Sequence, residues 1–460
     1  MRLTYTSRRR PRWGASLLVL GLLVGVAGCD SLLQVKDPTS ISGEDILKIS
    51  AANGMVNGAL SGVARGYGNI LAAYTTATDE MQWTGSRDDY RNLDLGNTGD
   101  PFNEFTDAQF TSLAQGRWMA DEAIRILEIH TASTEADSQL TDPVNLGYAY
   151  LYSAIARVII ADMYDDYVFS NRQEAGMPFG ERFGGNAMST LYTDAITRLT
   201  TAMSIAQTFG DAGLEMAALA MRARAHHAMA IWGKVGRRPI DTSNNGLVTT
   251  ANGVADARAV LAAAVPDYRY GFQYSSNTIS AGIAGWVNSR QEMRMAPTFA
   301  TPDPNGPAFL AVSLTDLIDV NTVSPELFRL IDDFTNNSNT TYPFLTVVSA
   351  REMHLIIAED ALASGNVAGF TTAINNLRAL DAGLTPFVNG GAGMPTAADL
   401  LVHSRATNLF LMGRRLQDLY RFGLRSAEWD NTSDAVVAPG TFFPISITEC
   451  RANENLPDAC

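Results

Sequence analysis

Apolar side chains recur at three- and four-residue spacing along most of this chain, and segments that alternate every second residue are few. Such spacing places one apolar face on a helix, whereas alternation is typical of strands. Clear examples are residues 148–163 and the alanine-rich residues 215–233. The sequence therefore predicts an all-α, mostly helical fold, in which alanine lets neighbouring helices approach closely.

A helix pair is predicted near the C-terminal end. Residues 351–363 and 367–380 each carry a helical apolar face, and Ser364-Gly365-Asn366 separates them. Two helices joined by a glycine-containing break make a unit of about thirty residues, the size of a tetratricopeptide-type repeat. We expect three or four such pairs along the chain, without clear sequence identity between them.

Three long segments lack this periodicity: residues 83–102, 265–307 and 332–341. All three are rich in polar turn residues, and the first two also contain several aromatic residues. Loops longer than about 15 residues in a compact domain are usually functional or disordered, and aromatic side chains argue against disorder. We therefore expect functional residues in these loops on a helical scaffold.

The N-terminus has the pattern of a bacterial lipoprotein signal peptide. Arginines precede an apolar segment, residues 15–26, which is shorter than the ~20 residues that a membrane-spanning helix needs. The segment ends at Val26-Ala27-Gly28-Cys29. We expect residues 1–28 to be removed and Cys29 to carry the acyl chains that hold the protein at a membrane. The alternative is an uncleaved N-terminal anchor helix.

The mature chain is strongly acidic. Residues 1–28 carry five arginines and no acids, so their removal takes the formal charge from −14 to −19. This charge argues against nucleic acid as a partner and against docking on an anionic bilayer through a basic face. No segment after Cys29 approaches about 18 uninterrupted apolar residues, so the rest of the chain is expected to be soluble.

Two cysteines remain once Cys29 is assigned to lipid. Cys450 and Cys460 are predicted to form a disulfide in an oxidising compartment, closing a short C-terminal loop. The alternative is two free thiols.

The acids and histidines of the sequence do not have the spacing of known catalytic or metal-binding motifs. Four pairs of adjacent acids occur, but glycosidase carboxylates face each other across a substrate, and adjacent acids on an acidic chain are mostly solvated. His226 and His227 point about 100 degrees apart on a helix, unlike the spacing of a zinc protease. We predict no enzymatic activity, no cofactor and no metal, with Ca²⁺ in the loops at 88–103 and 332–339 as an open alternative.

Four segments carry a resemblance to the SusD/RagB family. They are the mature start at Cys29-Asp-Ser-Leu-Leu-Gln-Val, the helix pair at 351–378, Gly413-Arg-Arg-Leu-Gln-Asp-Leu-Tyr-Arg-Phe-Gly423, and Phe442-Phe-Pro-Ile-Ser446. Each motif alone is weak, but together they span nearly the whole chain in the family's order. The chain departs from the family at Met412, His354 and the two C-terminal cysteines.

The resemblance implies a tether at 29–45 and a single SusD-like helical domain at 46–460, with parts at 46–250 and 251–460. It also implies a surface-facing outer-membrane lipoprotein without catalytic chemistry. Such a protein binds a nutrient, most often a glycan oligosaccharide, and acts as a lid on a SusC-like TonB-dependent transporter. The alternative is a helical-repeat scaffold that binds protein segments in a membrane complex and has no small ligand of its own.

Sugar capture needs flat aromatic faces for the C–H side of a pyranose, and amide, carboxylate and guanidinium groups for its hydroxyls. Two clusters in the long loops contain this mixture. The predicted ligand-binding residues are Trp83, Arg87, Asp88, Asp89 and Tyr90 in the first, and Tyr274, Trp286, Asn288 and Arg290 in the second. For Trp83, Tyr90 and Trp286 the alternative is a place in the core. Trp118, Trp232 and Trp429 are predicted to pack inside the protein.

The segment at 413–423 is predicted to be structural. Arg415, Asp418 and Arg421 are three residues apart in turn, so they share one helix face and are expected to form a row of ion pairs. Gly423 is well placed to end this helix. We expect the segment to lock the C-terminal part against the repeats.

Overall fold

The computed structural model describes residues 47–135, 139–171, 177–236, 240, 245–302, 309–335 and 342–456. Residues 52–460 form one compact unit, and residues 1–51 belong to another, in which the described secondary structure is η1 (Ile49–Ala51). The predicted signal peptide at 1–28, Cys29 and the tether at 29–45 lie outside the described residues, as does Cys460. Cys450 lies in the last helix, and its pairing with Cys460 stays a prediction.

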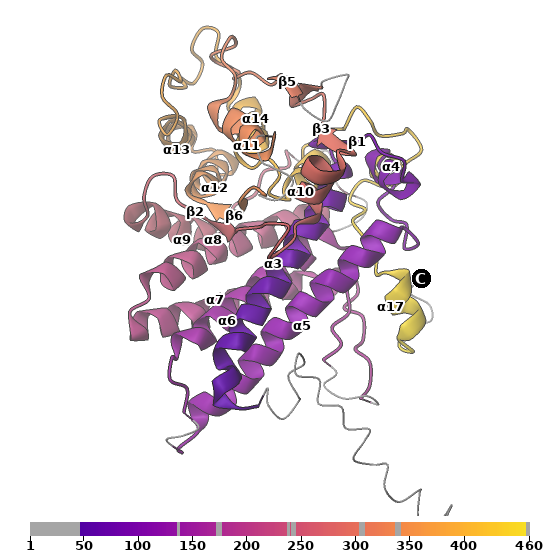
Figure 1. Cartoon of the computed structure of the whole chain (residues 1–460). Coiled ribbons are helices and arrows are strands. Elements are labelled where there is room, and N and C mark those ends of the chain that lie inside the picture. The colour runs from indigo at the N-terminus through magenta and orange to yellow at the C-terminus, as the bar shows by residue number, and fades with distance from the viewer. Residues whose placement is uncertain are drawn as a thin grey trace, which may run out of the picture. The chain divides into compact units, whose positions relative to one another are not determined.

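Helices dominate the larger unit, as the apolar spacing predicts (Figure 1). In chain order the helices are α3 (Ala52–Thr76), α4 (Asp88–Asp94), α5 (Glu104–Ala132), α6 (Val144–Met163), η3 (Gly185–Ala187), α7 (Ser189–Phe209), α8 (Ala212–Val235), α9 (Ala251–Ala263), α10 (Gly282–Ala284), η4 (Gly285–Arg290), α11 (Pro325–Thr335), α12 (Ala350–Ala363), α13 (Val367–Arg378), α14 (Ala397–Asn408), α15 (Arg415–Arg421), α16 (Asp434–Val437) and α17 (Ile447–Ala452). The strands are β1 (Met81–Trp83), β2 (Arg269–Phe272), β3 (Met293–Met295), β4 (Ala300–Pro302), β5 (Phe309–Val312) and β6 (Leu345–Ser349).

The long helices stack in chain order. Each helix from α5 to α9 packs on the next, α3 packs on α5 and α6, and α9 packs on α12. In Figure 1 the indigo to magenta helices lie side by side, and the orange helices α11 to α14 gather beyond them. Within the described residues, six strands form three two-stranded antiparallel sheets, β1–β3, β2–β6 and β4–β5, so distant parts of the chain are paired.

The predicted helix pair at 351–380 is confirmed as α12 and α13. Gly365 in the break has a φ of +72°, a left-handed conformation that glycine adopts without a steric penalty. The Asn366 side chain then accepts a hydrogen bond from the Gly369 amide and caps α13. Local turn chemistry therefore sets this pair.

Helix α6 is long and apolar enough to cross a membrane, and it is the one described helix that passes this test. However, 78% of its most apolar 18-residue window is buried inside the protein. It packs against α5 and α7, so its apolar surface is used by the core.

Two glycines let α3 and α5 approach closely. A Cβ atom on Gly116 would lie 2.6 Å from the carbonyl oxygen of Gly62, and a Cβ on Gly62 would lie 3.0 Å from the Cα of Gly116. The atoms in the way are backbone atoms of a packed helix, which cannot move independently. This contact requires glycine at position 116.

Gly116→Ala is expected to lower the free energy of unfolding by about 1–3 kcal/mol, because overpacking at the helix contact outweighs the better helix propensity of alanine. Gly233→Ala is the matched control, since a Cβ on Gly233 in α8 has nothing within 4 Å. That control is expected to be neutral or stabilising by up to about 1 kcal/mol. Urea unfolding of both variants measures the difference, and equal effects would contradict the close contact.

Buried ion pairs join the C-terminal helices to the rest of the unit. Arg421 contacts the carboxylates of Glu359 and Asp418, and Arg405 donates to Asp418 at 2.8 Å. The structural role predicted for 413–423 agrees with this burial, and Gly423 ends α15 with a φ of +63°.

Two predictions about these charges are wrong. Arg415 does not continue the row on α15 but pairs with Asp79 at 2.6 Å, because Asp79 reaches it from the segment between α3 and β1. Adjacent acids were also expected to be solvated. Asp79, Glu80 and Glu359 are instead buried, since arginines and backbone amides supply partners that the sequence spacing does not show.

Candidate functional site

The β1–β3 sheet brings the two predicted clusters together. Met81 pairs with Met295, and Trp83 pairs with Met293, which places the segment after α3 beside the segment around Trp286. The same elements lie near α4 and α10 in Figure 1. Two loop segments that are about two hundred residues apart in the sequence thus form one surface.

Four aromatic rings meet there and are named the aromatic cluster: Trp83, Tyr90, Phe105 and Trp286. Tyr90 stacks between two of them, with ring centroids 4.6 Å from Trp83 and 3.7 Å from Phe105. Trp286 presents its edge or face to the other three at 5.3–5.9 Å. Stacked and edge-to-face pairs at these distances are favourable beyond their burial.

Burial divides the aromatic cluster into an inner and an outer part. Trp83 and Tyr90 are buried, with 3% and 0% exposure, so the alternative of a place in the core holds for both, and neither offers a free face to a ligand. Trp286 and Phe105 are half-buried and lie outside them. The reason is the β1–β3 pairing and the stacking by Phe105, which cover the inner rings.

Phe105 was not predicted as a site residue. It lies at the second position of α5, where the Asn103 side chain accepts hydrogen bonds from the amides of Phe105 and Thr106. The sequence Asn103-Glu104-Phe105 predicts the start of a helix, but it does not show that this helix begins beside Trp286.

Trp286 lies in an unusual backbone segment. The helix η4 is a π-helix, and it ends at Gln291, which has a φ of +58° without being glycine. Both features are rare, and both are enriched at functional sites. The Arg290 guanidinium lies 4.8 Å from the centroid of the Trp286 ring and pairs with Glu292 at 3.0 Å, so one charged group borders the ring.

Charged groups surround the aromatic cluster on the α4 side. Arg87 pairs with Glu104 at 3.2 Å, and about half of each side chain is exposed. The Asp89 carboxylate accepts a hydrogen bond from the Glu104 amide at 2.6 Å. Asp88 is exposed in the first turn of α4, inside a segment that was predicted to be loop.

Two of the predicted ligand-binding residues make hydrogen bonds to the backbone of neighbouring helices. Tyr274 is 1% exposed, and its hydroxyl donates to the carbonyl of Ala64 in α3 at 2.6 Å, away from the aromatic cluster. The Asn288 amide donates to the carbonyl of Phe334 at 2.6 Å and ties η4 to α11. Their sequence neighbours are polar, but α3 packs over Tyr274, and α11 holds the half-buried Asn288.

Buried carboxyl groups hold β1 in place. Glu80 accepts the Leu411 amide at 2.8 Å, and Asp94 accepts the Trp83 amide at 3.3 Å. Burial raises the pKa of Glu80 to about 8 and that of Asp94 to about 7. The Leu411 backbone has a φ of +57°, so Glu80 supports a strained position as well as the strand.

Glu80→Gln is expected to flatten the pH dependence of stability. The folded protein keeps the Glu80 proton to about pH 8, whereas the unfolded chain releases it near 4.5. The folded state therefore binds more protons between these values, and the free energy of unfolding falls as the pH rises through them. Glutamine keeps the acceptor for Leu411 and cannot ionise, so it should recover about 5 kcal/mol at pH 8.5, because the shift from 4.5 to about 8 costs about 1.4 kcal/mol per pKa unit.

Urea unfolding at pH 5 and pH 8.5 measures this difference, with the exposed Glu454→Gln as control. The raised pKa of Asp94 also makes the free energy of unfolding fall as the pH rises. Asp94 is present in the wild type and in both variants, so its contribution cancels when they are compared. If the free energy of unfolding of Glu80→Gln fell between pH 5 and pH 8.5 as much as that of the wild type, the raised pKa of Glu80 would be contradicted.

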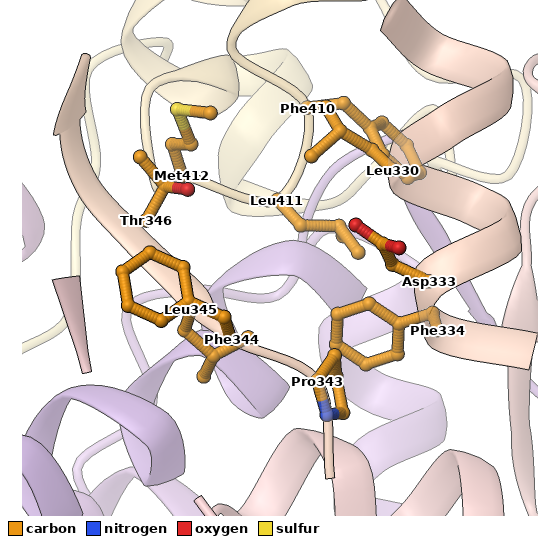
Figure 2. A pocket seen from close by; sticks show the side chains of 10 residues that line it. All are labelled: Leu330, Asp333, Phe334, Pro343, Phe344, Leu345, Thr346, Phe410, Leu411 and Met412. Carbon is orange, nitrogen blue, oxygen red and sulfur yellow. The ribbon is translucent and has the colours of Figure 1, made fainter. Parts of the chain in front are cut away.

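A separate small hollow of about 20 Å³ lies between α11, β6 and residues 410–412. Figure 2 shows that aliphatic and aromatic side chains surround it. Asp333 is its one charged lining residue, and Asp333 pairs with Arg329 at 2.6 Å. This lining lacks the mixture of polar groups that a sugar requires.

No group of three or more His, Cys, Asp or Glu side chains that could hold a metal ion is found within the described residues. His227 instead lies 3.0 Å from the Glu359 carboxylate in the core. Among the tryptophans outside the aromatic cluster, Trp232 and Trp429 are buried, as predicted. Trp118 is half-buried and borders a hollow, so its predicted place in the core is wrong.

No protein-family model matches the sequence, and no curated protein matches it either. Solved structures match it over nearly their whole length. A SusD superfamily protein from Bacteroides vulgatus has a TM-score of 0.60 at 15% identity, covering 88% of this chain and 97% of that one. A SusD-like carbohydrate binding protein from the same organism has a TM-score of 0.58 at 14% identity, covering 89% and 97%.

Surface glycan-binding protein A from Bacteroides uniformis gives a TM-score of 0.55 at 12% identity, covering 88% of this chain and 98% of that one. At such low identities the likeness concerns the fold. These structural neighbours show that this chain shares the fold of SusD-like proteins.

Proposed function

We propose that this protein binds a glycan at the outer part of the aromatic cluster. The observation that carries the proposal is the meeting of Trp286 with Trp83, Tyr90 and Phe105 across the β1–β3 sheet. Structural neighbours described as carbohydrate binding and glycan-binding proteins support the ligand class. In this arrangement buried rings fix the orientation of half-buried ones before a ligand arrives.

The half-buried rings offer apolar surface to the C–H side of a pyranose, and the neighbouring charged groups offer donors and acceptors to its hydroxyls. Arg290 borders the Trp286 ring, and Arg87, Asp88 and Glu104 lie exposed on the α4 side. Fixed rings lose little conformational freedom on binding, which favours affinity. The site binds and orients its ligand, and we assign it no catalytic step.

Trp286→Ala is expected to weaken oligosaccharide binding by about tenfold or more, equal to about 1.4 kcal/mol, because it removes the outer ring face. Calorimetric titration of the full-length protein with malto-, cello- and xylo-oligosaccharides measures the affinity. Phe344→Ala is the control, since Phe344 is an exposed aromatic residue that borders the hollow in Figure 2. Loss of binding in Phe344→Ala but not in Trp286→Ala would move the site to that hollow.

We further propose that Cys29 is lipidated, that the protein faces outward from the outer membrane, and that it delivers its ligand to a SusC-like TonB-dependent transporter. The lipoprotein pattern before Cys29 supports the anchor, and the SusD fold supports the partner. The acyl chains would keep the protein beside the transporter during opening.

A C-terminal tag on the full chain is expected to capture a β-barrel transporter from detergent-solubilised membranes. Cys29→Ser should shift the protein out of the membrane fraction, because the acyl chains are lost. Protease treatment of intact cells should degrade the wild-type protein. Complete protection from protease, together with capture of other proteins but no barrel, would favour the helical scaffold alternative.

A further inference from the structure

A second hollow, of about 380 Å³, runs along α5 beside Trp118. Phe110, Trp118 and Met119 of α5 line one side of it. Val168 and Ser170, from the segment after α6, and Glu449 of α17 line the other. None of these residues belongs to the aromatic cluster.

Trp118 differs from the other tryptophans of the described chain. Each of the other four has an aromatic neighbour: Trp83 and Trp286 in the aromatic cluster, Trp232 beside Phe442, and Trp429 beside Tyr420. Trp118 has no ring partner and no hydrogen-bond partner among the residues that the structure describes, and its side chain is half-buried at the hollow. Core packing does not account for a large indole in this position.

The wall opposite Trp118 is fixed by buried groups. Arg117, which is 2% exposed, donates to the Ser170 carbonyl at 3.1 Å and pairs with Asp121 at 3.1 Å. Its guanidinium also lies 4.5 Å from the centroid of the Phe169 ring. The Glu449 carboxylate accepts the Asn453 amide at 3.0 Å. The hollow is therefore a built feature and not a gap between loosely held segments.

The lining separates apolar from polar groups. Phe110 and Val168, with 2% and 3% exposure, form an apolar floor beside Arg117, which is equally buried and is paired with the Ser170 carbonyl and Asp121. The other polar lining residues, Gln115, Ser170 and Glu449, are less buried. A sugar with hydroxyls on every side would leave some of them against the floor without partners, at a cost of about 1–3 kcal/mol each. A sugar with a methyl or acetyl substituent would place that group on the floor instead.

We infer that this hollow is a second carbohydrate site, and that it takes a sugar residue whose substituent ends in a methyl group, such as an acetamido or 6-deoxy sugar. The Trp118 indole stacks on the C–H face of the sugar, and Gln115, Ser170 and Glu449 bond its hydroxyls. The inference rests on the proposed glycan-binding function, but it concerns different residues and a narrower class of ligand.

The test uses pairs of probes that differ only in the substituent. Methyl N-acetyl-β-glucosaminide is compared with methyl β-glucoside, and L-fucose with L-galactose, by saturation-transfer NMR and calorimetry on the full-length protein. In each pair the substituted sugar is expected to bind about tenfold tighter or more. Trp118→Ala should abolish this preference for the substituted sugar.

Gln115→Trp provides a second variant that does not touch the core, because Gln115 is exposed at the mouth of the hollow and a larger ring would fill it. Ile129→Trp is its matched control, an exposed position on α5 that does not line the hollow. Binding lost in Gln115→Trp and kept in Ile129→Trp supports the site. Equal binding in the wild type, Trp118→Ala and Gln115→Trp overturns it, as does the absence of a preference for the substituted sugars.

The two proposals fail in different ways. If oligosaccharides bind in a Trp286-dependent manner but neither substituted probe binds, the second site is refuted and the proposed function stands. If no sugar binds to the wild-type protein, both are refuted.

Discussion

Buried arginine–carboxylate pairs determine how the C-terminal helices sit on the rest of the unit. Removing an ion from water costs several kcal/mol unless a partner of opposite charge meets it. The Arg421 side chain has 0% exposure and meets Glu359 and Asp418, while Arg414 meets Glu352 at 2.8 Å. Burial would raise the pKa of Glu359, but Arg421, His227 and Arg405 hold it well below its usual value. These charges are satisfied only when α12, α14 and α15 are in this arrangement.

The same set of pairs extends to the proposed binding surface. Arg415 of α15 pairs with Asp79, and the next residue, Glu80, accepts a hydrogen bond from the Leu411 amide. Both acids lie directly before β1, so these contacts fix the start of the strand. β1 then pairs with β3 and brings Trp83 to Trp286. A helix that lies more than three hundred residues later in the chain thus helps to position the first strand of the site. This dependence explains how short strands of three residues can keep a defined register.

The sequence predictions succeeded where neighbours along the chain decide the outcome. The break at Ser364-Gly365-Asn366 and the end of α15 at Gly423 depend on glycine conformation and local caps, and both were predicted correctly. The clusters around Trp83 and Trp286 were predicted separately, and the structure joins them. The sequence left open whether Trp83 and Tyr90 are exposed, and the structure buries both of them and Tyr274, because their covering groups come from distant elements.

The sequence alone determined the helical class, the helix pair at 351–380 and the segments in which binding residues were to be sought. These follow from periodicity and turn chemistry, which act over a few residues. Only the tertiary structure decided that Arg415 pairs with Asp79, that Phe105 completes the aromatic cluster and that Trp118 borders a hollow. Burial and ion pairing depend on which elements meet, and residues that are far apart in the chain make those contacts.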